Sequence, residues 1–341
     1  MAQNSSLANA TVGAFTTQTL AAIVASFSAL SAGVFTPGNI FFLDPKNGSD
    51  LTGDGTVNKP MGTLAGAYAL MVAGNNDIIA LVGDGATDAT ARVSAAFTWA
   101  KNACHLIGMC PPGLYSQRAR IAPKTTDAAF TPFFTLSATG CIFQNVEIYA
   151  GFTTGMAAAV AVVISGGRNV FRNCQLVGMS DAASAADAGS RSLKLSGGEE
   201  NYFVDCVIGD DTTARGAVAN ASIEFAALAG KASTRNVFRG CRVPIFTSAA
   251  NPLGILGTGA SCVDRDNTFE DCTFINQIKS SSVQMTVFGS FTSASPGGMI
   301  IFKNCSMIGV TKFGDTNFLA NSVLDMSAPS NSAGGLMVPP T

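Results

Sequence analysis

The chain has 341 residues and a formal net charge of −2 at pH 7, and only 12% of its residues are charged. Soluble domains usually contain about 25% charged residues, so the composition predicts a surface rich in small uncharged side chains. No block of Lys or Arg occurs in the sequence, which excludes an electrostatic footprint for nucleic acid. The nine cysteines are an odd number, so we expect reduced thiols and assembly in a reducing cytoplasm.

The first 43 residues contain no charged side chain, and the first charge is Asp44. Residues 20–35, LAAIVASFSALSAGVF, form an apolar run without the basic flank of a secretory signal. The run is also too short and too rich in serine to cross a bilayer. We therefore predict an N-terminal arm over residues 1–40 and no membrane association.

Residues 44–70 predict a turn-rich segment that ends in a short helix. The turn formers of DPKNGSDLTGDGTVNKP precede Thr63, Leu64 and Ala67, and an apolar strand follows at residues 76–85. A helix here would cover the apolar end of a stacked structure, as repeat proteins require. We assign residues 41–76 to this leading segment and its capping helix.

The rest of the chain repeats one phrase six times. Two copies are GGRNVFRNCQLVGM and DRDNTFEDCTFINQ, and a degenerate first copy is GCIFQNVEIYAG. Aligned on their phenylalanines, the copies lie 28 to 35 residues apart, a period typical of repeat architectures. Alternating branched and aromatic residues bounded by glycine predict strands rather than the helices of a helical solenoid. The aligned residues are Phe143, Phe171, Phe203, Phe238, Phe269 and Phe302.

Each phrase predicts a strand, a one-residue corner and a second strand. The Phe points inward and the next residue outward. The corner residue is Asn, Asp or Gly, which tolerate the left-handed backbone of a sharp bend. The following Cys points inward again as a small apolar filler. The corners are Asn173, Asp205, Gly240, Asp271 and Asn304, and the cysteines are Cys174, Cys206, Cys241, Cys272 and Cys305.

A corner repeated without an intervening helix returns the chain onto itself, so that like residues stack along an axis. In these motifs the chain resembles the right-handed parallel β-helix superfamily, which includes pectin-degrading lyases, bacteriophage tailspikes and other virion proteins. The resemblance covers about residues 40–315 and is specific for the fold. It implies an all-β protein, a right-handed single-stranded parallel β-helix over residues 77–320 with a C-terminal tail over residues 321–341.

Carboxylate pairs across a groove would indicate a glycosidase. Acids at corners, or one turn away from Arg or Lys, have structural explanations. Asp210, Asp211 and Glu224, together with Arg215, could form a site, although a turn followed by a strand explains them equally well. We therefore predict no catalytic residue. The weaker candidates are Glu199, Glu200, Asp205, Asp264, Asp266, Glu270 and Asp271.

No metal or cofactor site is predicted either. Lyases of this superfamily hold calcium with several Asp, but Asp50 and Asp54 lack the spacing of a calcium loop. His105, the only histidine, lies between Cys104 and Cys110. Neighbouring strand residues face opposite ways and no second cysteine pair completes a zinc set, so we interpret His105 as structural.

Two function hypotheses follow. The phrases GGRNVFRNCQLVGM, GGEENYFVDCVIGDDT and DRDNTFEDCTFIN are similar to those of a family of phage proteins of the virion head. With the uncharged N-terminal arm, this similarity implies a homotrimeric capsid decoration (cement) protein that binds the phage major capsid protein and is not an enzyme. It would lie on the capsid surface of the virion after assembly in the host cytoplasm. The alternative is a tailspike or tail-fibre β-helix that binds or depolymerises host surface polysaccharide.

Overall fold

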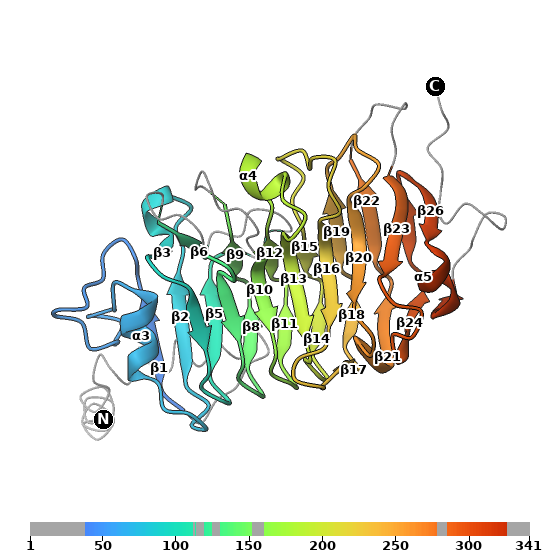
Figure 1. The fold of residues 1–341 in the computed structure, drawn as a ribbon. Coiled ribbons are helices and arrows are strands. Elements are labelled where there is room, and N and C mark those ends of the chain that lie inside the picture. Colours follow the sequence, from blue (N-terminus) through green and yellow to red (C-terminus); the bar gives the residue numbers. More distant parts are fainter. Residues whose placement is uncertain are drawn as a thin grey trace, which may run out of the picture.

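The structure is a computed structural model that describes residues 38–111, 113, 119–124, 130–151, 160–277 and 285–325. These residues form a right-handed parallel β-helix (Figure 1). Each full turn contributes one strand to each of three parallel sheets, so neighbouring strands in a sheet come from successive turns. The predicted fold class is confirmed.

The strands and helices are as follows. Sheet 1 contains β1 (Ile40–Leu43), β2 (Ile78–Val82), β5 (His105–Met109), β8 (Ile142–Gln144), β11 (Val170–Arg172), β14 (Tyr202–Val204), β18 (Val237–Arg239), β21 (Val263–Glu270), β24 (Gly298–Lys303) and β27 (Ser322–Asp325), with β17 (Ser233–Thr234) paired to β21. Sheet 2 contains β3 (Ala91–Val93), β6 (Arg120–Pro123), β9 (Glu147–Tyr149), β12 (Gln175–Val177), β15 (Val207–Ile208), β19 (Arg242–Ile245), β22 (Thr273–Asn276) and β25 (Ser306–Ile308). Sheet 3 contains β4 (Phe97–Trp99), β7 (Phe134–Leu136), β10 (Val160–Ile164), β13 (Arg191–Ser196), β16 (Ala221–Ala226), β20 (Leu253–Thr258), β23 (Met285–Phe291) and β26 (Val310–Gly314). The helices are α3 (Leu64–Leu70), α4 (Ala182–Ala185), α5 (Thr316–Ala320) and the 3-10 turn η1 (Thr87–Ala89).

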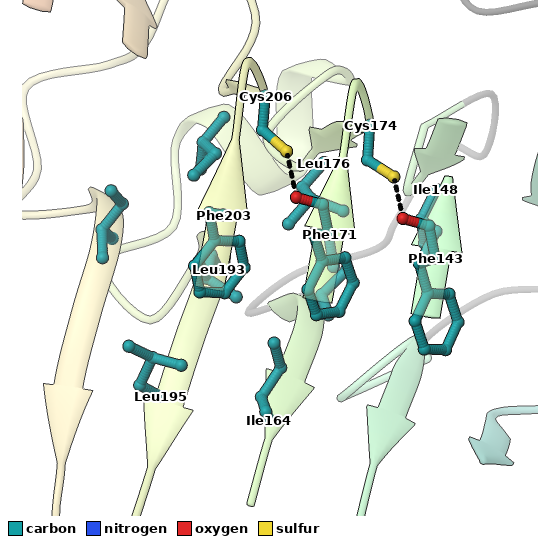
Figure 2. Packing of buried hydrophobic residues seen from close by; sticks show 14 of the residues in the cluster. Phe143, Ile148, Ile164, Phe171, Cys174, Leu176, Leu193, Leu195, Phe203 and Cys206 are labelled. Carbon is teal, nitrogen blue, oxygen red and sulfur yellow. Dashed lines mark hydrogen bonds between the residues drawn. The ribbon is translucent and has the colours of Figure 1, made fainter. Parts of the chain in front are cut away.

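The phenylalanines of the six phrases form one continuous stack inside sheet 1. Consecutive rings lie 4.4 to 5.2 Å apart with interplanar angles of 4° to 11°. Figure 2 shows three of them, Phe143, Phe171 and Phe203, on successive strands. This spacing is close to the ~4.8 Å between hydrogen-bonded strands. The repeated Phe is therefore explained by the strand spacing itself, which brings each ring against the next.

The corners and the cysteines also lie where the phrase predicts. The five corner residues from Asn173 to Asn304 have φ between 49° and 63°, the left-handed region in which Asn, Asp and Gly are least strained. The next residue, a cysteine, points inward and donates its thiol proton to a Phe carbonyl of the preceding turn. For Cys174 the acceptor is the Phe143 carbonyl at 3.3 Å, and for Cys206 it is the Phe171 carbonyl at 3.5 Å (Figure 2).

These thiols are expected to be chemically inert in the folded protein. All nine are free; Cys110 is half-buried and the other eight are buried. Burial raises the pKa of the Cys104 and Cys262 thiols to about 11, and the thiolate is the reactive form. At pH 8 we expect a chromogenic disulfide reagent to modify at most Cys110 in the native protein, and all nine thiols after unfolding in urea. Modification of several thiols at a rate unrelated to unfolding would contradict this closed packing.

In the four central phrases, the Asn two residues before the Phe forms a second ladder, whose role the sequence pattern does not reveal. Asn169, Asn201, Asn236 and Asn267 are each at most 1% exposed. Asn201 Nδ2 donates to Asn236 Oδ1 at 3.0 Å, and Asn236 Nδ2 donates to Asn267 Oδ1 at 2.8 Å. The Oδ1 of each later Asn also accepts the backbone N–H of the Asn before it. The ladder thus satisfies buried polar groups where the chain enters sheet 1.

Helices close both ends of the stack. At the N-terminal end, α3 begins after Thr63, whose Oγ1 accepts from the Gly66 N–H, which confirms the predicted capping helix. Lys101 Nζ donates to the Tyr68 and Met71 carbonyls, both at 2.6 Å, and so satisfies the C-terminal end of this helix. At the other end, α5 packs Phe318 against Phe313 with ring centroids 5.4 Å apart.

Sheet 1 extends beyond residues 77–320 in both directions. β1 pairs in register with β2, and β27 pairs in register with β24, so the leading segment and the start of the tail each supply a strand. Of the predicted arm over residues 1–40 and tail over residues 321–341, all but residues 38–40 and 321–325 lie outside the described residues. In the described part of the chain, no helix has the length and apolarity needed to span a bilayer.

Candidate functional site

Charged residues gather on the outer faces of sheets 2 and 3 and in the loops that connect these two sheets, because the residues that alternate with them on the strands fill the core. These loops, one of which contains α4, lie along one edge of the β-helix (Figure 1). We use the name polar seam for eight residues. They are Arg120, Glu147 and Tyr149 of sheet 2, Asp210 and Arg215 of the loop after β15, and Arg191, Lys194 and Glu224 of sheet 3.

Glu224 is the centre of a buried ion triad. Its Oε2 lies 2.7 Å from Arg191 Nε and its Oε1 lies 3.0 Å from Lys194 Nζ. The side chains of Glu224 and Arg191 are 5% and 7% exposed, whereas that of Lys194 is 30% exposed. Lys194 and Glu224 are directly opposite each other on β13 and β16. The pairing of strands from consecutive turns therefore creates this triad.

Arg215 is a buried cation of a different kind. It donates from Nη2 to Ser222 Oγ at 2.6 Å and from Nη1 to the Leu253 carbonyl at 3.2 Å. Among the described residues, no carboxylate lies within 4.0 Å of its guanidinium nitrogens. Burial lowers the pKa of Arg215 to about 9, with Asp210 acting in the opposite direction and Arg191 lowering it further. Buried charges are ordinarily paired, so Arg215 is the exceptional residue of the polar seam.

The sheet 2 side of the polar seam contains a second ion pair. Arg120 Nε lies 2.5 Å from Glu147 Oε2, and the guanidinium lies over the Tyr149 ring at 5.3 Å from its centroid. Burial raises the pKa of the Tyr149 hydroxyl, and the nearby Asp210 carboxylate adds to the rise. Asp210 therefore lies close enough to influence both Tyr149 and Arg215.

The structure brings together part of the acid cluster predicted from the sequence. Asp210 is 8% exposed and accepts from the N–H and hydroxyl of Thr212 and from the N–H of Thr213, so it also stabilises its own turn. Glu224 is linked to this region through Arg191, whose charge acts on Arg215. Asp211 follows in the same loop and is half-buried.

The other acidic candidates take part in ion pairs, corners and turns, and Asp266 is half-buried on β21. Glu270 lies between Arg239 and Lys303 of the neighbouring turns, at 3.9 and 3.2 Å. Glu200 pairs in the same way with Arg168 and Arg235. The remaining contacts follow: Glu199 pairs with Arg168, Asp264 pairs with Arg265, Asp205 and Asp271 form corners, Asp50 accepts from the N–H groups of Gly62 and Thr63, and Asp54 accepts from Thr56.

His105 occupies a structural position. It is 5% exposed on the outward side of β5, and its Nδ1 accepts from the Ile142 N–H at 3.1 Å. Cys104 points the opposite way, into the core. The described residues contain no group of three or more His, Cys, Asp or Glu side chains arranged to hold a metal ion.

The position of His105 predicts an acid-dependent loss of stability. Burial lowers its pKa, against an opposing effect of the Asp77 carboxylate. In the unfolded chain the His105 imidazole has its ordinary pKa of about 6.5. As the pH drops below 7, the unfolded chain therefore binds more protons than the folded protein, and the free energy of unfolding falls. Urea unfolding at pH 7 and pH 5 should show a smaller decrease for His105→Gln than for the native protein. An equal decrease in both would mean that His105 is not held neutral.

Sequence reasoning missed Arg191, Lys194, Arg120 and Glu147. Each lies on a short strand, and within one strand each is an ordinary polar residue. Their spacing along the chain ranges from 27 residues between Arg120 and Glu147 to 33 between Arg191 and Glu224. Their contacts depend on how successive turns of the β-helix stack on one another, and the repeated Phe phrase does not reveal that stacking for these residues.

Three solved structures with a fold similar to that of this chain are a pectin methylesterase, a pectate lyase and a rhamnogalacturonan lyase. A pectin methylesterase in complex with a hexasaccharide is 16% identical at a TM-score of 0.53, over 89% of this chain and 93% of that chain. A pectate lyase is 14% identical at a TM-score of 0.53, over 90% of this chain and 80% of that chain. A rhamnogalacturonan lyase is 15% identical at a TM-score of 0.52, over 81% and 75% of the two chains. No protein-family model and no curated protein sequence matches the chain.

These comparisons overturn the expectation that the chain is not an enzyme. The three solved structures named above are an esterase and two lyases, and none of the three is a virion protein. That expectation depended on finding ordinary explanations for each acidic residue, and it overlooked the buried cations of the polar seam. At this level of identity the likeness establishes the fold alone. The chain has the pectate-lyase-like, right-handed parallel β-helix fold.

Proposed function

We propose that the protein binds and processes an acidic polysaccharide at the polar seam. The observation that carries the proposal is Arg215, a buried guanidinium that donates hydrogen bonds to a hydroxyl and to a backbone carbonyl. A guanidinium has five N–H donors and matches a carboxylate in a two-point contact. An acidic sugar would therefore complete the charge balance that the described residues leave open.

The charges of the polar seam support an anionic ligand. Four cations face three carboxylates, since Arg120 pairs with Glu147, and Arg191 and Lys194 share Glu224, while Asp210 is bonded within its own turn. The polar seam therefore has one surplus positive charge, with two cations sharing Glu224 and with Asp210 acting on Arg215 without a direct ion pair. The polar seam spans four successive turns from β6 to β16, about 15 Å along the axis. This length favours an extended ligand over a single sugar.

The solved structures that share the fold support the substrate class. The pectin methylesterase was solved with a hexasaccharide. Proteins that share a fold differ in the residues that each adds to the common framework to form its ligand site. In this chain the added residues are cationic. We place the reacting part of the substrate beside Arg215 because a desolvated cation stabilises developing negative charge more strongly than an exposed one.

The test compares Arg215→Gln with Arg239→Gln, an exposed arginine of sheet 1. Calorimetric titration with polygalacturonate, and with neutral dextran as a second ligand, should show binding of the acidic polymer only. Arg215→Gln should weaken it by about tenfold or more, which corresponds to about 1.4 kcal/mol, and Arg239→Gln should not.

Because Arg215 is buried, its variant also needs a folding control. Lys194→Gln, at the more exposed end of the triad, should weaken binding while leaving the melting temperature nearly unchanged. Product assays for reducing ends, released methanol and unsaturated uronate would identify the reaction. Failure of the native protein to bind any acidic polysaccharide would refute the proposal.

A virion protein remains the second candidate, in two forms. The first is the tailspike or tail-fibre protein, for which the polar seam would be the polysaccharide site. The second is the homotrimeric decoration protein bound to the major capsid protein, favoured by the phrases that resemble virion-head proteins. Size exclusion with mass detection, with and without isolated capsids, distinguishes them: co-migration of a trimer with capsids would support decoration.

A further inference from the structure

Four isoleucines form an apolar cluster on the outer face of sheet 1. We call Ile40, Ile78, Ile107 and Ile142 the outer isoleucine cluster; it is separate from the interior core. The four come from successive strands β1, β2, β5 and β8, and Ile40 lies directly opposite Ile78. Ile78 and Ile107 are only 2% and 4% exposed, while Ile40 and Ile142 are half-buried. His105, on the same outer face, uses its Nδ1 to accept from the Ile142 N–H.

The outer face of sheet 1 has two rows of side chains, and the row of Ile142 continues through Val170, Tyr202, Val237, Thr268 and Ile301, whereas the row of Ile107 becomes charged along the axis. At the position of Ile107 the later turns place Gln144, then Arg172 and, farther on, Arg239, Glu270 and Lys303. Charged residues are the ordinary choice for an outer sheet face in water. Near the N-terminal end of the sheet both rows contain isoleucine, so the half-buried Ile40 and Ile142 are the part of this face best suited to contact with a further apolar segment.

The chain outside the described residues ends beside this cluster. Residues 1–37 join the described part at Gly38, two residues before Ile40. Gly38 packs against the turn before β2, where a Cβ would meet the Asn75 carbonyl oxygen at 2.3 Å. This approach brings the chain to the sheet edge next to Ile78. Residues 20–35 are an apolar run, and the whole of residues 1–37 lacks charge.

We propose that residues 20–35 bind the outer isoleucine cluster of their own chain. The 18 residues from 20 to 37 could extend about 60 Å, while the cluster spans four strands, about 15 Å. The segment is therefore long enough to reach the cluster, and its covalent attachment gives it an effective concentration in the millimolar range at that surface. An uncharged apolar segment suits this aliphatic surface better than the charged residues that follow Ile107 in the same row of later turns. The proposal is independent of the polysaccharide function.

A photocrosslinking experiment on the full-length chain tests this proposal. p-Benzoylphenylalanine is placed at position 142 in one variant and at position 301 in a matched control, because Ile301 faces outward on the same sheet five strands farther along. An equal mixture of nitrogen-14 and nitrogen-15 protein is irradiated and its crosslinked peptides are identified by mass spectrometry. We expect crosslinks from position 142 to residues 20–35 within one isotope, and none from position 301.

Three results would overturn the proposal. Crosslinks that join the two isotopes would show that the segment binds a second copy. Equal yields from positions 142 and 301, or no crosslink to residues 20–35 from position 142, would show that the outer isoleucine cluster is not its binding surface.

Deletion of residues 1–37 provides an independent measurement. The truncated protein should bind an environment-sensitive hydrophobic dye several-fold more strongly than the full-length chain, and Ile142→Lys in the truncated protein should remove most of that increase. Unchanged dye binding on truncation would contradict the proposal. A far-ultraviolet circular dichroism spectrum of the truncated protein provides the control for folding.

Discussion

Replacing Glu224 with alanine is expected to lower the free energy of unfolding by about 3–5 kcal/mol. The carboxylate is 5% exposed and bonded to Arg191 and Lys194. Lys194 is partly exposed and can turn toward water, but Arg191 is 7% exposed and would keep its charge without the carboxylate. A buried charge that loses its partner costs far more than the pair contributes. Urea unfolding at pH 7 measures the change.

The chain contains a matched control for this experiment. Glu270 also lies between two cations of neighbouring turns, but its side chain and those of Arg239 and Lys303 are 28%, 58% and 52% exposed. Glu270→Ala should cost at most about 1 kcal/mol. Equal losses from Glu224→Ala and Glu270→Ala would show that burial does not control the strength of these ion pairs. The double variant Arg191→Met/Glu224→Met should recover part of the loss, because no unpaired charge remains.

Asn236→Ala should destabilise the protein by about 3 kcal/mol. Asn236 Oδ1 accepts from both the N–H and the Nδ2 of Asn201, and its own Nδ2 donates to Asn267 and to the Gly198 carbonyl. Truncation leaves the Asn201 N–H buried without its partner and opens a cavity between turns. The free energy of unfolding from urea titration provides the measurement.

The control for this prediction is an asparagine that makes a similar bond at the surface. Asn251 is exposed and donates from Nδ2 to the Ala217 carbonyl of the preceding turn at 3.0 Å. Water can replace that bond, so Asn251→Ala should change stability by no more than about 0.5 kcal/mol. If the two variants were equally stable, the buried ladder would not be a stabilising network.

The fold could be predicted because each phrase contains its own explanation. Phe171 and Cys174 point inward, Arg172 points outward and Asn173 forms the corner, and all four follow from local strand alternation and backbone preference. Repetition then places each phrase on the next. The role of Asn169 in the same phrase could not be predicted in this way. An Asn before a strand is common in proteins. Only the stacking of successive turns brings the asparagines together as a buried hydrogen-bonded ladder.

The polar seam could be predicted only in part. Asp210, Arg215 and Glu224 are close enough in sequence to suggest a cluster, but the partners of Glu224 come from the preceding turn. The variable loops between sheets 2 and 3 contain no repeated phrase, so the sequence does not align their turns. The expectation of no enzymatic role, which the comparison with solved enzyme structures contradicts, had considered the acidic residues and not the buried arginines.

The sequence alone determined that the chain coils into a stacked parallel β-helix, since a strand, a left-handed corner and an inward Phe recur in every copy and each requires only local geometry. The tertiary structure decided which polar residues meet. Register between turns paired Lys194 with Glu224, aligned the four asparagines and buried Arg215 beneath its loop. The physical reason is that electrostatic and hydrogen-bonding contacts between turns join residues about 30 positions apart, and their strength depends on burial, which no local pattern specifies.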